Sequence, residues 1–275
     1  MAKRIREYHR PETMAEAAAL YDRKDVECVP LLLDQQPDVD AYYRAEAVVD
    51  LGHLSLNYIK EENDVVRIGV LTPLQTLVES PLIQSIASGI LSEAAQMSAH
   101  LGLRHLIPLH NLWYGDEALE VRIALSALRA DHVFYDSSFL ENSPSTDTEF
   151  RVHHVPDTFQ GRFIEVRIPF RAGLYGGAAR VARTPRDHPI VAAYAVVTVT
   201  AGVIQHVSVS YRVGGSGAVI MGRSVDAQYM QQVEDHINQH RLTSIHTGSG
   251  EYRQEMLVVV SRRAIELACK RAGVK

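Results

Sequence analysis

An apolar run of fifteen residues, IVAAYAVVTVTAGVI at 190–204, constrains the fold of this chain more than any other stretch. The run is too short to span a bilayer as a helix, which takes about 20 apolar residues. It is rich in β-branched side chains, which favour extended backbone. The short turn Ala201-Gly202 leads on into VIQHVSVSYRV, a second segment of the same kind. The pattern predicts two paired strands in the core of a soluble domain.

The composition is that of a globular protein, with 46% apolar and 22% charged residues. A net charge of -5 gives no support for binding a nucleic-acid backbone or an anionic membrane surface. Cys28 and Cys269 are far apart in sequence, which indicates reduced thiols rather than a disulfide framework. The opening MAKRIREYHRPE lacks the apolar core of a secretory signal. We therefore expect a cytoplasmic protein with no nucleic-acid and no membrane partner.

Helices and strands alternate irregularly along the first half of the chain. Thr13 followed by Glu16 is a capping box that opens an alanine-rich helix. The apolar segment VVRIGVL is typical of a strand, and Thr72 with Gln75 forms a second capping box directly after it. Such a mixture, followed by the paired strands and a long C-terminal helical segment, predicts an α+β fold.

We place a domain boundary near Pro169, where the strand RFIEVRIPF ends. The predicted N-terminal domain covers 1–169 and has two subdomains that split near residue 60. The predicted C-terminal domain covers 170–275 and consists of an antiparallel sheet with helices.

Five stretches, in order, resemble the flavin-binding medium subunit of the molybdenum hydroxylases, the group of xanthine dehydrogenase and carbon monoxide dehydrogenase. They are YHRPETMAEAAAL, VVDLGHLSLNYI with VVRIGVLTPLQTLVESPLI, ILSEAAQMSA, RFIEVRIPF and GEYRQEMLVVVSRRAIELA. Together they cover nearly the whole chain. The resemblance implies a FAD-binding domain of the PCMH type, followed by a domain like the C-terminal domain of the CO dehydrogenase flavoprotein.

Members of that family hold FAD across two glycine-rich loops, roughly AGGTD and TIGGN. Glycine lets backbone N–H groups approach the pyrophosphate without a Cβ in the way. Here the loops align to PLLLD at 30–34 and IPLHN at 107–111, so that only Asp34 and Asn111 match among the residues that set these loops apart. Pro108 also removes a backbone donor. Leucines at these places tend to collapse into the space of a ligand, because burying each one is worth about 1.5 to 3 kcal/mol.

A third departure lies in LYGGAARVAR. Tyr175 and Arg183 match the family, but Gly177 stands where the family usually has a lysine. All three departures remove capacity to bind an anion, so we expect no cofactor, with FAD as the alternative. The family-matched positions that would hold FAD, if it is bound, are Asp34, Gly69, Thr72, Asn111, Asp116 and Tyr175. Thr72 and Asp116 are also explained as helix caps.

Other motifs in the sequence predict no site. His100, His105 and His110 are spaced by five, which suits neither a helix face nor a compact metal motif. The stretch GGSGAVIMG at 214–222 fits neither a dinucleotide fingerprint nor a P-loop. Cys28 lies beside the first loop without an identifiable base. We predict no catalytic residue and no metal site.

The leading hypothesis is a homologue of the flavin subunit that has lost or weakened FAD binding and acts as a structural or regulatory partner, or uses the vacated cleft for another ligand. One alternative is a genuine medium subunit that carries electrons in a xanthine or CO dehydrogenase-like enzyme, with molybdenum-cofactor and iron–sulfur subunits as partners. Another is a self-associating, stand-alone enzyme that binds an apolar small molecule in the cleft. Whether the chain is an enzyme stays open; the family-based interpretation is a FAD-dependent oxidoreductase subunit.

Overall fold

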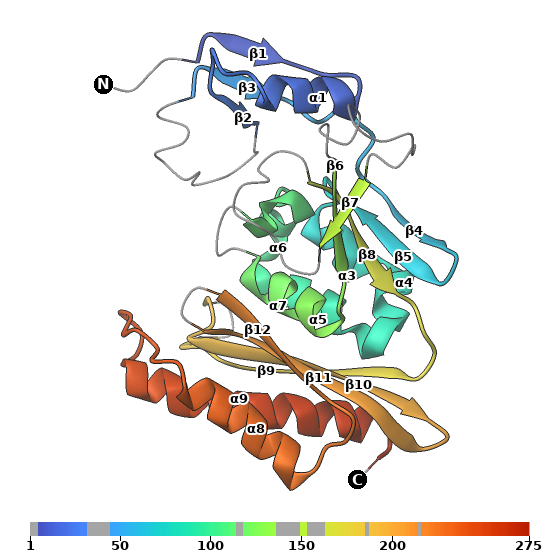
Figure 1. The fold of residues 1–275 in the computed structure, drawn as a ribbon, viewed down its shortest axis with the longest axis vertical. Helices are drawn as coiled ribbons and strands as arrows, with labels where there is room; N and C mark the ends of the chain where they lie inside the picture. Colours follow the sequence, from blue (N-terminus) through green and yellow to red (C-terminus); the bar gives the residue numbers. More distant parts are fainter. Residues whose placement is uncertain are drawn as a thin grey trace. The chain divides into compact units, whose positions relative to one another are not determined.

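The computed structural model describes residues 5–31, 45–113, 118–135, 149–152, 163–184, 187–213 and 216–274. The chain forms two compact units, neither of them continuous in sequence (Figure 1). The first unit comprises 1–74, 105–116 and 130–168, and the second comprises 75–104, 117–129 and 169–275. The chain passes for the last time from the first unit to the second at Pro169. The boundary there and the subdomain split near residue 60 stay predictions about domain organisation.

The first unit begins with a small parallel sheet in the order β1-β3-β2. Its strands are β1 (Glu7–His9), β2 (Cys28–Pro30) and β3 (Ala47–Val49), and helix α1 spans Met14–Tyr21. The predicted cap of α1 is confirmed, because the Thr13 hydroxyl accepts a hydrogen bond from Glu16 N at 3.1 Å. Ala17 of α1 packs with Val49 and Leu51 in a small apolar cluster. The helix thus buries its alanine side against the end of β3.

The same unit contains a five-stranded sheet in the order β4-β5-β8-β6-β7. The strands are β4 (Ile59–Glu62), β5 (Val65–Gly69), β6 (Asp131–Tyr135), β7 (Glu149–Val152) and β8 (Phe163–Pro169). Val66 and Ile68 of β5 and Val166 and Ile168 of β8 are buried. Successive side chains of a strand point to opposite faces of its sheet. The opposite face therefore carries Arg67 from β5, and Glu165 and Arg167 from β8. One face of this sheet is therefore apolar, and the other carries charges.

The second unit is built on a four-stranded antiparallel sheet in the order β12-β11-β10-β9. The strands are β9 (Leu174–Val181), β10 (Val191–Thr200), β11 (Val203–Val213) and β12 (Ser216–Gly222). The predicted hairpin is confirmed: Thr200 pairs with Val203 across a turn in which Ala201 and Gly202 have φ of 52° and 77°. Glycine adopts positive φ without the clash that a Cβ brings. The apolar run therefore forms the centre of this sheet.

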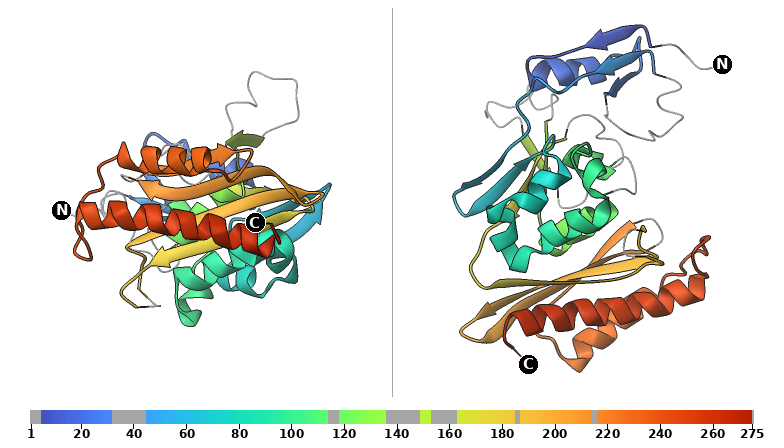
Figure 2. Two further views of the ribbon diagram at one scale, coloured as in Figure 1. Left: turned by 90° about the horizontal axis from the view of Figure 1, so that it is seen from below. Right: turned by 180° about the vertical axis from the view of Figure 1, so that it is seen from behind.

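Helices cover both faces of the four-stranded sheet (Figures 1 and 2). One face packs on α8 (Ala227–Asn238) and α9 (Gly250–Arg271), with a core that includes Val197, Val209 and Ile265. On the other face, Ser208 of β11 donates to Ala127 O in α7 (Leu119–Ala127) at 2.6 Å. The helices α3 (Leu74–Glu79), α4 (Pro81–Ser85), α5 (Ile90–Ser98) and α6 (Leu101–Arg104) and the 3-10 segment η1 (Ile86–Gly89) precede α7. The mixed α+β architecture expected from the sequence is confirmed.

The second capping box is not formed. The Thr72 hydroxyl, expected to cap the helix that follows it, instead accepts from Tyr58 N and donates to Tyr58 O, both at 3.1 Å. Gln75, the expected box partner, bonds to Glu79 and Arg104. A tertiary contact across 14 residues has replaced the local one.

The described helices were also compared with the needs of a membrane span. None of them combines the length and the apolar character that crossing a membrane requires.

Candidate functional site

The turn after β5 and the loop 107–112 form one structure in the first unit. Leu109 N donates to Thr72 O at 2.9 Å, and His110 N donates to Val70 O at 2.7 Å. In the other direction, Leu74 N donates to Ile107 O at 2.9 Å. The two proline-containing segments thus lie antiparallel to each other, and 70–74 serves as the pairing partner of the loop. Residues 109–113 of the loop then continue as the 3-10 helix η2 (Leu109–Trp113).

Gly69 and Thr72, two of the family-matched positions, are held by the protein's own backbone. A Cβ on Gly69 would lie 2.1 Å from Leu56 O, so that no larger residue fits there. Gly69 N donates to Tyr58 O at 2.9 Å, and the fully buried Thr72 hydroxyl bonds to the same residue. Packing within the unit accounts for both residues without a ligand. Their assignment to FAD stays a prediction.

The described loop offers no free backbone donor from 109 to 111. Besides the two bonds given above, Asn111 N donates to Pro108 O at 3.0 Å. The side chains are buried as well, namely Ile107, Leu109, His110, Asn111 and Leu112. Within the described part of the chain, Asn111 Oδ1 is a buried acceptor that has no hydrogen-bond partner. Burial lowers the pKa of His110 to about 4, so that its ring is neutral at pH 7.

A charged network adjoins this turn through Tyr58. The Tyr58 hydroxyl donates to Glu165 Oε2 at 2.5 Å, and Arg67 Nε donates to both oxygens of Glu165 at 3.0 and 2.9 Å. Arg167 donates to Glu165 from the same strand. Burial raises the pKa of Glu165, but the bonds from Arg67, Tyr58 and Arg167 outweigh it and leave that pKa below its ordinary value. Two guanidinium groups thus keep a fully buried carboxylate ionised, and Tyr58 links this carboxylate to Thr72.

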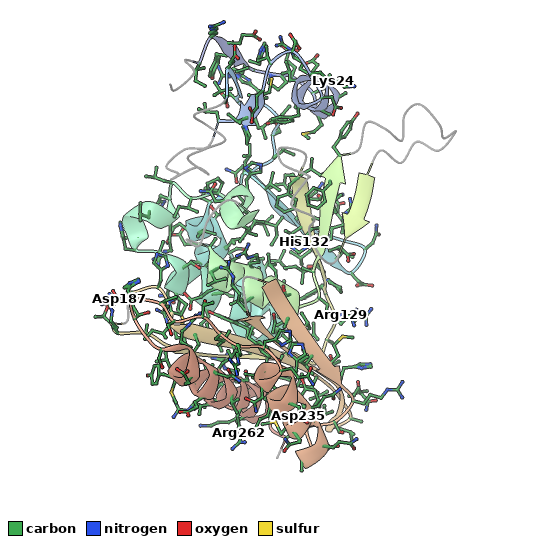
Figure 3. The ribbon with its side chains drawn as sticks, turned by 60° about the vertical axis from the view of Figure 1, so that its left-hand side comes forward. Lys24, Arg129, His132, Asp187, Asp235 and Arg262 are labelled. Carbon is green, nitrogen blue, oxygen red and sulfur yellow. The ribbon has the colours of Figure 1, made fainter. Side chains whose placement is uncertain are left out.

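The second unit has a buried polar group of its own. Arg180 of β9 donates to Glu120 of α7 at 3.2 and 3.1 Å, and the Tyr194 hydroxyl of β10 donates to Glu120 Oε1 at 3.3 Å. Arg180 also donates to Met97 O and to the carbonyl of Asp187, which Figure 3 labels. Burial raises the pKa of Glu120 to about 7, against the opposing effect of Arg180. The group joins two helices, two strands and a loop.

The sequence analysis missed both buried groups. Glu120 lies in EALEVRIAL, where a glutamate is normal on an exposed helix face, and nothing local indicates that this face is buried. Glu165 and Arg167 were easier to predict from the sequence, because their charges alternate with apolar residues in the strand FIEVRIP. Such alternation indicates a sheet with one charged face. That signal was available in the sequence.

Three family-matched positions remain, of which the structure describes only Tyr175, in the second unit. Asp34 and Asp116 lie outside the described residues. Tyr175 of β9 packs against the core of the second unit. Gly177 lies on the same side of β9, where a Cβ would come 2.2 Å from Ala264 O and 2.6 Å from Ala268 N of α9. A lysine has no room at that position.

The described loop does not fit a FAD cradle of the glycine-rich kind. Such a cradle needs free N–H groups and no Cβ facing the pyrophosphate. The N–H groups of residues 109 to 111 are bonded within the unit, and Leu109 and Leu112 are fully buried. In the first loop, Leu31 N donates to Val49 O at 2.8 Å, and the residues after Leu31 lie outside the described part.

No protein-family model matches this chain, and no curated protein does. Solved structures match over its whole length. A cyanide-inactivated Cu,Mo-CO dehydrogenase has a TM-score of 0.80 at 22% identity, covering 98% of this chain and 100% of that chain. A CO dehydrogenase from Hydrogenophaga pseudoflava that lacks the Mo-pyranopterin moiety has a TM-score of 0.78 at 19% identity, covering 98% and 99%. Quinoline 2-oxidoreductase from Pseudomonas putida 86 has a TM-score of 0.76 at 17% identity, covering 99% of both chains.

These matches confirm the fold expected from the sequence, that of the molybdenum hydroxylase flavin subunit. They also correct the expectation that the chain has no cofactor. The fold shared over 98% of the chain is that of the flavin subunit, so the fold gives no ground for expecting the cofactor to be absent. We expected no cofactor because glycines are missing from two loops, yet missing glycines exclude only the glycine-rich way of holding a pyrophosphate.

Proposed function

We propose that this chain is the medium subunit of an oxidoreductase assembly of the molybdenum hydroxylase kind, and that it holds FAD more weakly than glycine-rich loops would. The observation that carries the proposal is the whole-length fold match, at a TM-score of 0.80 and with 100% of the matched chain covered. A match that covers 98% of this chain and 100% of the matched chain supports a fold kept over nearly the full length of such a subunit.

Weaker binding follows from the loop 107–112. Its backbone N–H groups at 109 to 111 would first have to break hydrogen bonds within the unit before they could bind a phosphate. Each such exchange costs roughly 1 to 3 kcal/mol if the carbonyl partner is left unpaired in the interior. FAD would therefore depend on other donors for its phosphates. Asn111, whose buried Oδ1 lacks a partner in the described part, would instead accept a hydrogen bond from an N–H or O–H group of FAD.

The partners that this function requires are a subunit with a molybdenum cofactor and a subunit with iron–sulfur clusters. Support for them comes from the neighbours, since two of the matched chains belong to molybdenum-containing or molybdenum-depleted CO dehydrogenases by name. FAD, when bound, would supply the redox chemistry of the subunit.

The test is a titration of the purified chain with FAD, followed by flavin fluorescence quenching and by the melting temperature. We expect saturable binding and a melting temperature that rises with FAD, because a ligand that binds only the folded state stabilises it. Asn111→Ala should lower the affinity for FAD about tenfold, whereas Leu106→Ala, at an exposed position beside the loop, should leave it unchanged. An unmoved melting curve at millimolar FAD would refute FAD binding.

A second candidate function is that of a structural or regulatory subunit of the same kind of assembly. The observation in its favour is the loop whose backbone donors are already bonded. Affinity purification of the tagged chain from its native host distinguishes the two candidates. Co-purification with a molybdenum-containing partner but without flavin absorbance would favour the structural role, and co-purification with flavin would favour the medium subunit.

A further inference from the structure

Two histidines lie together at the end of α8, in the second unit and apart from the loop 107–112. His236 belongs to α8, and His240 follows it by four residues, so that the two share one side of the helical turn. Their ring centroids are 4.8 Å apart, and their planes are inclined by 39°. Two imidazoles at this helical spacing are the pair that binds zinc in helical metal motifs.

The Nδ1 atom of each ring has a hydrogen bond to the protein. His240 Nδ1 donates to His236 O at 2.9 Å, which places the proton on Nδ1 and a lone pair on Nε2. His236 Nδ1 is 2.9 Å from the Tyr211 hydroxyl. Among the described residues, no partner is recorded for either Nε2. Metal-binding histidines show this division, with one ring nitrogen bonded to the protein and the other facing the ion.

The distance between the rings suits a shared ion. Two imidazoles bound at the usual Zn–N distance of about 2.0 to 2.1 Å, with an angle near the tetrahedral value, have ring centres about 5 Å apart. The observed 4.8 Å is close to that separation.

An open groove of about 640 Å³ lies beside His236. Its other lining residues are Ile220, Gln228, Gln231, Gln232, Asp235 and Gln239. Four amides and one carboxylate line the groove and can hydrogen-bond to water molecules without adding a positive charge. Asp235, labelled in Figure 3, lies on α8 next to His236.

We propose that His236 and His240 bind a divalent transition-metal ion of the zinc, nickel or copper class through their Nε2 atoms, with water in its remaining positions. The described part of the chain has no group of three or more His, Cys, Asp and Glu that could hold a metal. The site is therefore a two-histidine site, open to exchange and to a further ligand from solvent or from a partner. It does not depend on FAD or on the loop 107–112.

The experiment is a calorimetric titration of the untagged full chain with zinc chloride. We expect one ion per chain, and His240→Gln should weaken binding at least about tenfold, since even the loss of an outer partner of a metal ligand costs 10- to 100-fold. His206→Gln, at an exposed histidine of β11, is the matched control and should change nothing. Equal affinity in His240→Gln, an equal loss in His206→Gln, or no binding by the parent chain would each overturn the proposal.

A second pair of variants separates ligation from structural support. His236→Asn removes a ligand together with its bond to Tyr211, and Tyr211→Phe removes the same bond but leaves both Nε2 atoms. We expect His236→Asn to abolish zinc binding and Tyr211→Phe to weaken it by less than His240→Gln does. If Tyr211→Phe abolishes binding as fully as His236→Asn, the histidines are not the ligands.

Discussion

Strand β9 and the loop 107–112 both depart from the family pattern, and the two departures have different physical causes. In the loop, bulky residues stand where the family has glycines, and the backbone bonds to the segment 70–74. In β9, Gly177 stands where the family has a lysine, and α9 packs so closely that a Cβ would lie 2.2 Å from Ala264 O. In the loop the backbone donors are bonded within the unit, whereas in β9 the glycine is required by helix–sheet packing. A missing residue type therefore does not identify a lost function by itself.

The largest effect that tests this comparison is expected at Gly177. Gly177→Leu has to push β9 and α9 apart, because the nearest atoms are backbone atoms that cannot rotate away. We expect it to reduce the free energy of unfolding by more than about 4 kcal/mol, beyond the usual range for overpacking. Urea unfolding measures the change. Gly102→Leu, in the exposed part of α6 with His100 as its nearest neighbour at 3.4 Å, should cost little, and equal costs for the two variants would remove the packing explanation.

A core role for the loop is tested at Leu109. Leu109→Ala removes a fully buried side chain and should reduce the free energy of unfolding by about 3 kcal/mol, within the 2 to 5 kcal/mol typical of such cavities. Leu106→Ala, at 52% exposure in the same loop, should change it by less than about 0.5 kcal/mol. Chemical denaturation followed by circular dichroism compares the pair. A Leu109→Ala variant as stable as Leu106→Ala would mean that the loop is not part of the core.

Burial of Glu120, which contacts Arg180 of strand β9, makes the stability of the second unit depend on pH. The pKa of Glu120 is raised from 4.5 to about 7 in the folded state, so the folded state binds this proton more tightly than the unfolded state does. The contribution is fully present below pH 4.5 and is lost as the pH rises through 7. It amounts to roughly 3 to 4 kcal/mol at about 1.4 kcal/mol per pKa unit.

The contribution of Glu120 to stability is measured with unfolding curves at pH 5 and pH 8. The curves are recorded for the parent chain and for Glu120→Gln. Glu120→Gln should lose the corresponding part of the pH dependence, whereas Glu266→Gln, at an exposed glutamate of α9, should keep it. An unchanged pH dependence in Glu120→Gln would show that Glu120 stays ionised across this range.

Sequence patterns predicted the local structure correctly where the hydrogen bonds or turn lie within one short segment of the chain. The cap at Thr13 needs only the backbone three residues on, and the hairpin at Ala201-Gly202 needs only a turn that accepts positive φ. The second capping box failed because Tyr58, distant in sequence, offered Thr72 two hydrogen bonds in the interior. The pairing of the loop 107–112 with 70–74 was beyond prediction for the same reason. Each of these outcomes depends on which segments the fold brings together.

The sequence by itself determined the α+β class, the buried hairpin of the second unit and, through five stretches in order, the flavin-subunit fold. These features depend on periodicity, turn chemistry and the order of segments, all of which are written along the chain. Only the tertiary structure decided that Gly177 is required by α9, that the donors of the loop are already bonded, and that Glu120 and Glu165 are buried with arginine partners. Packing and burial depend on which distant segments come into contact. The sequence of a single segment does not show which segment will pack against it.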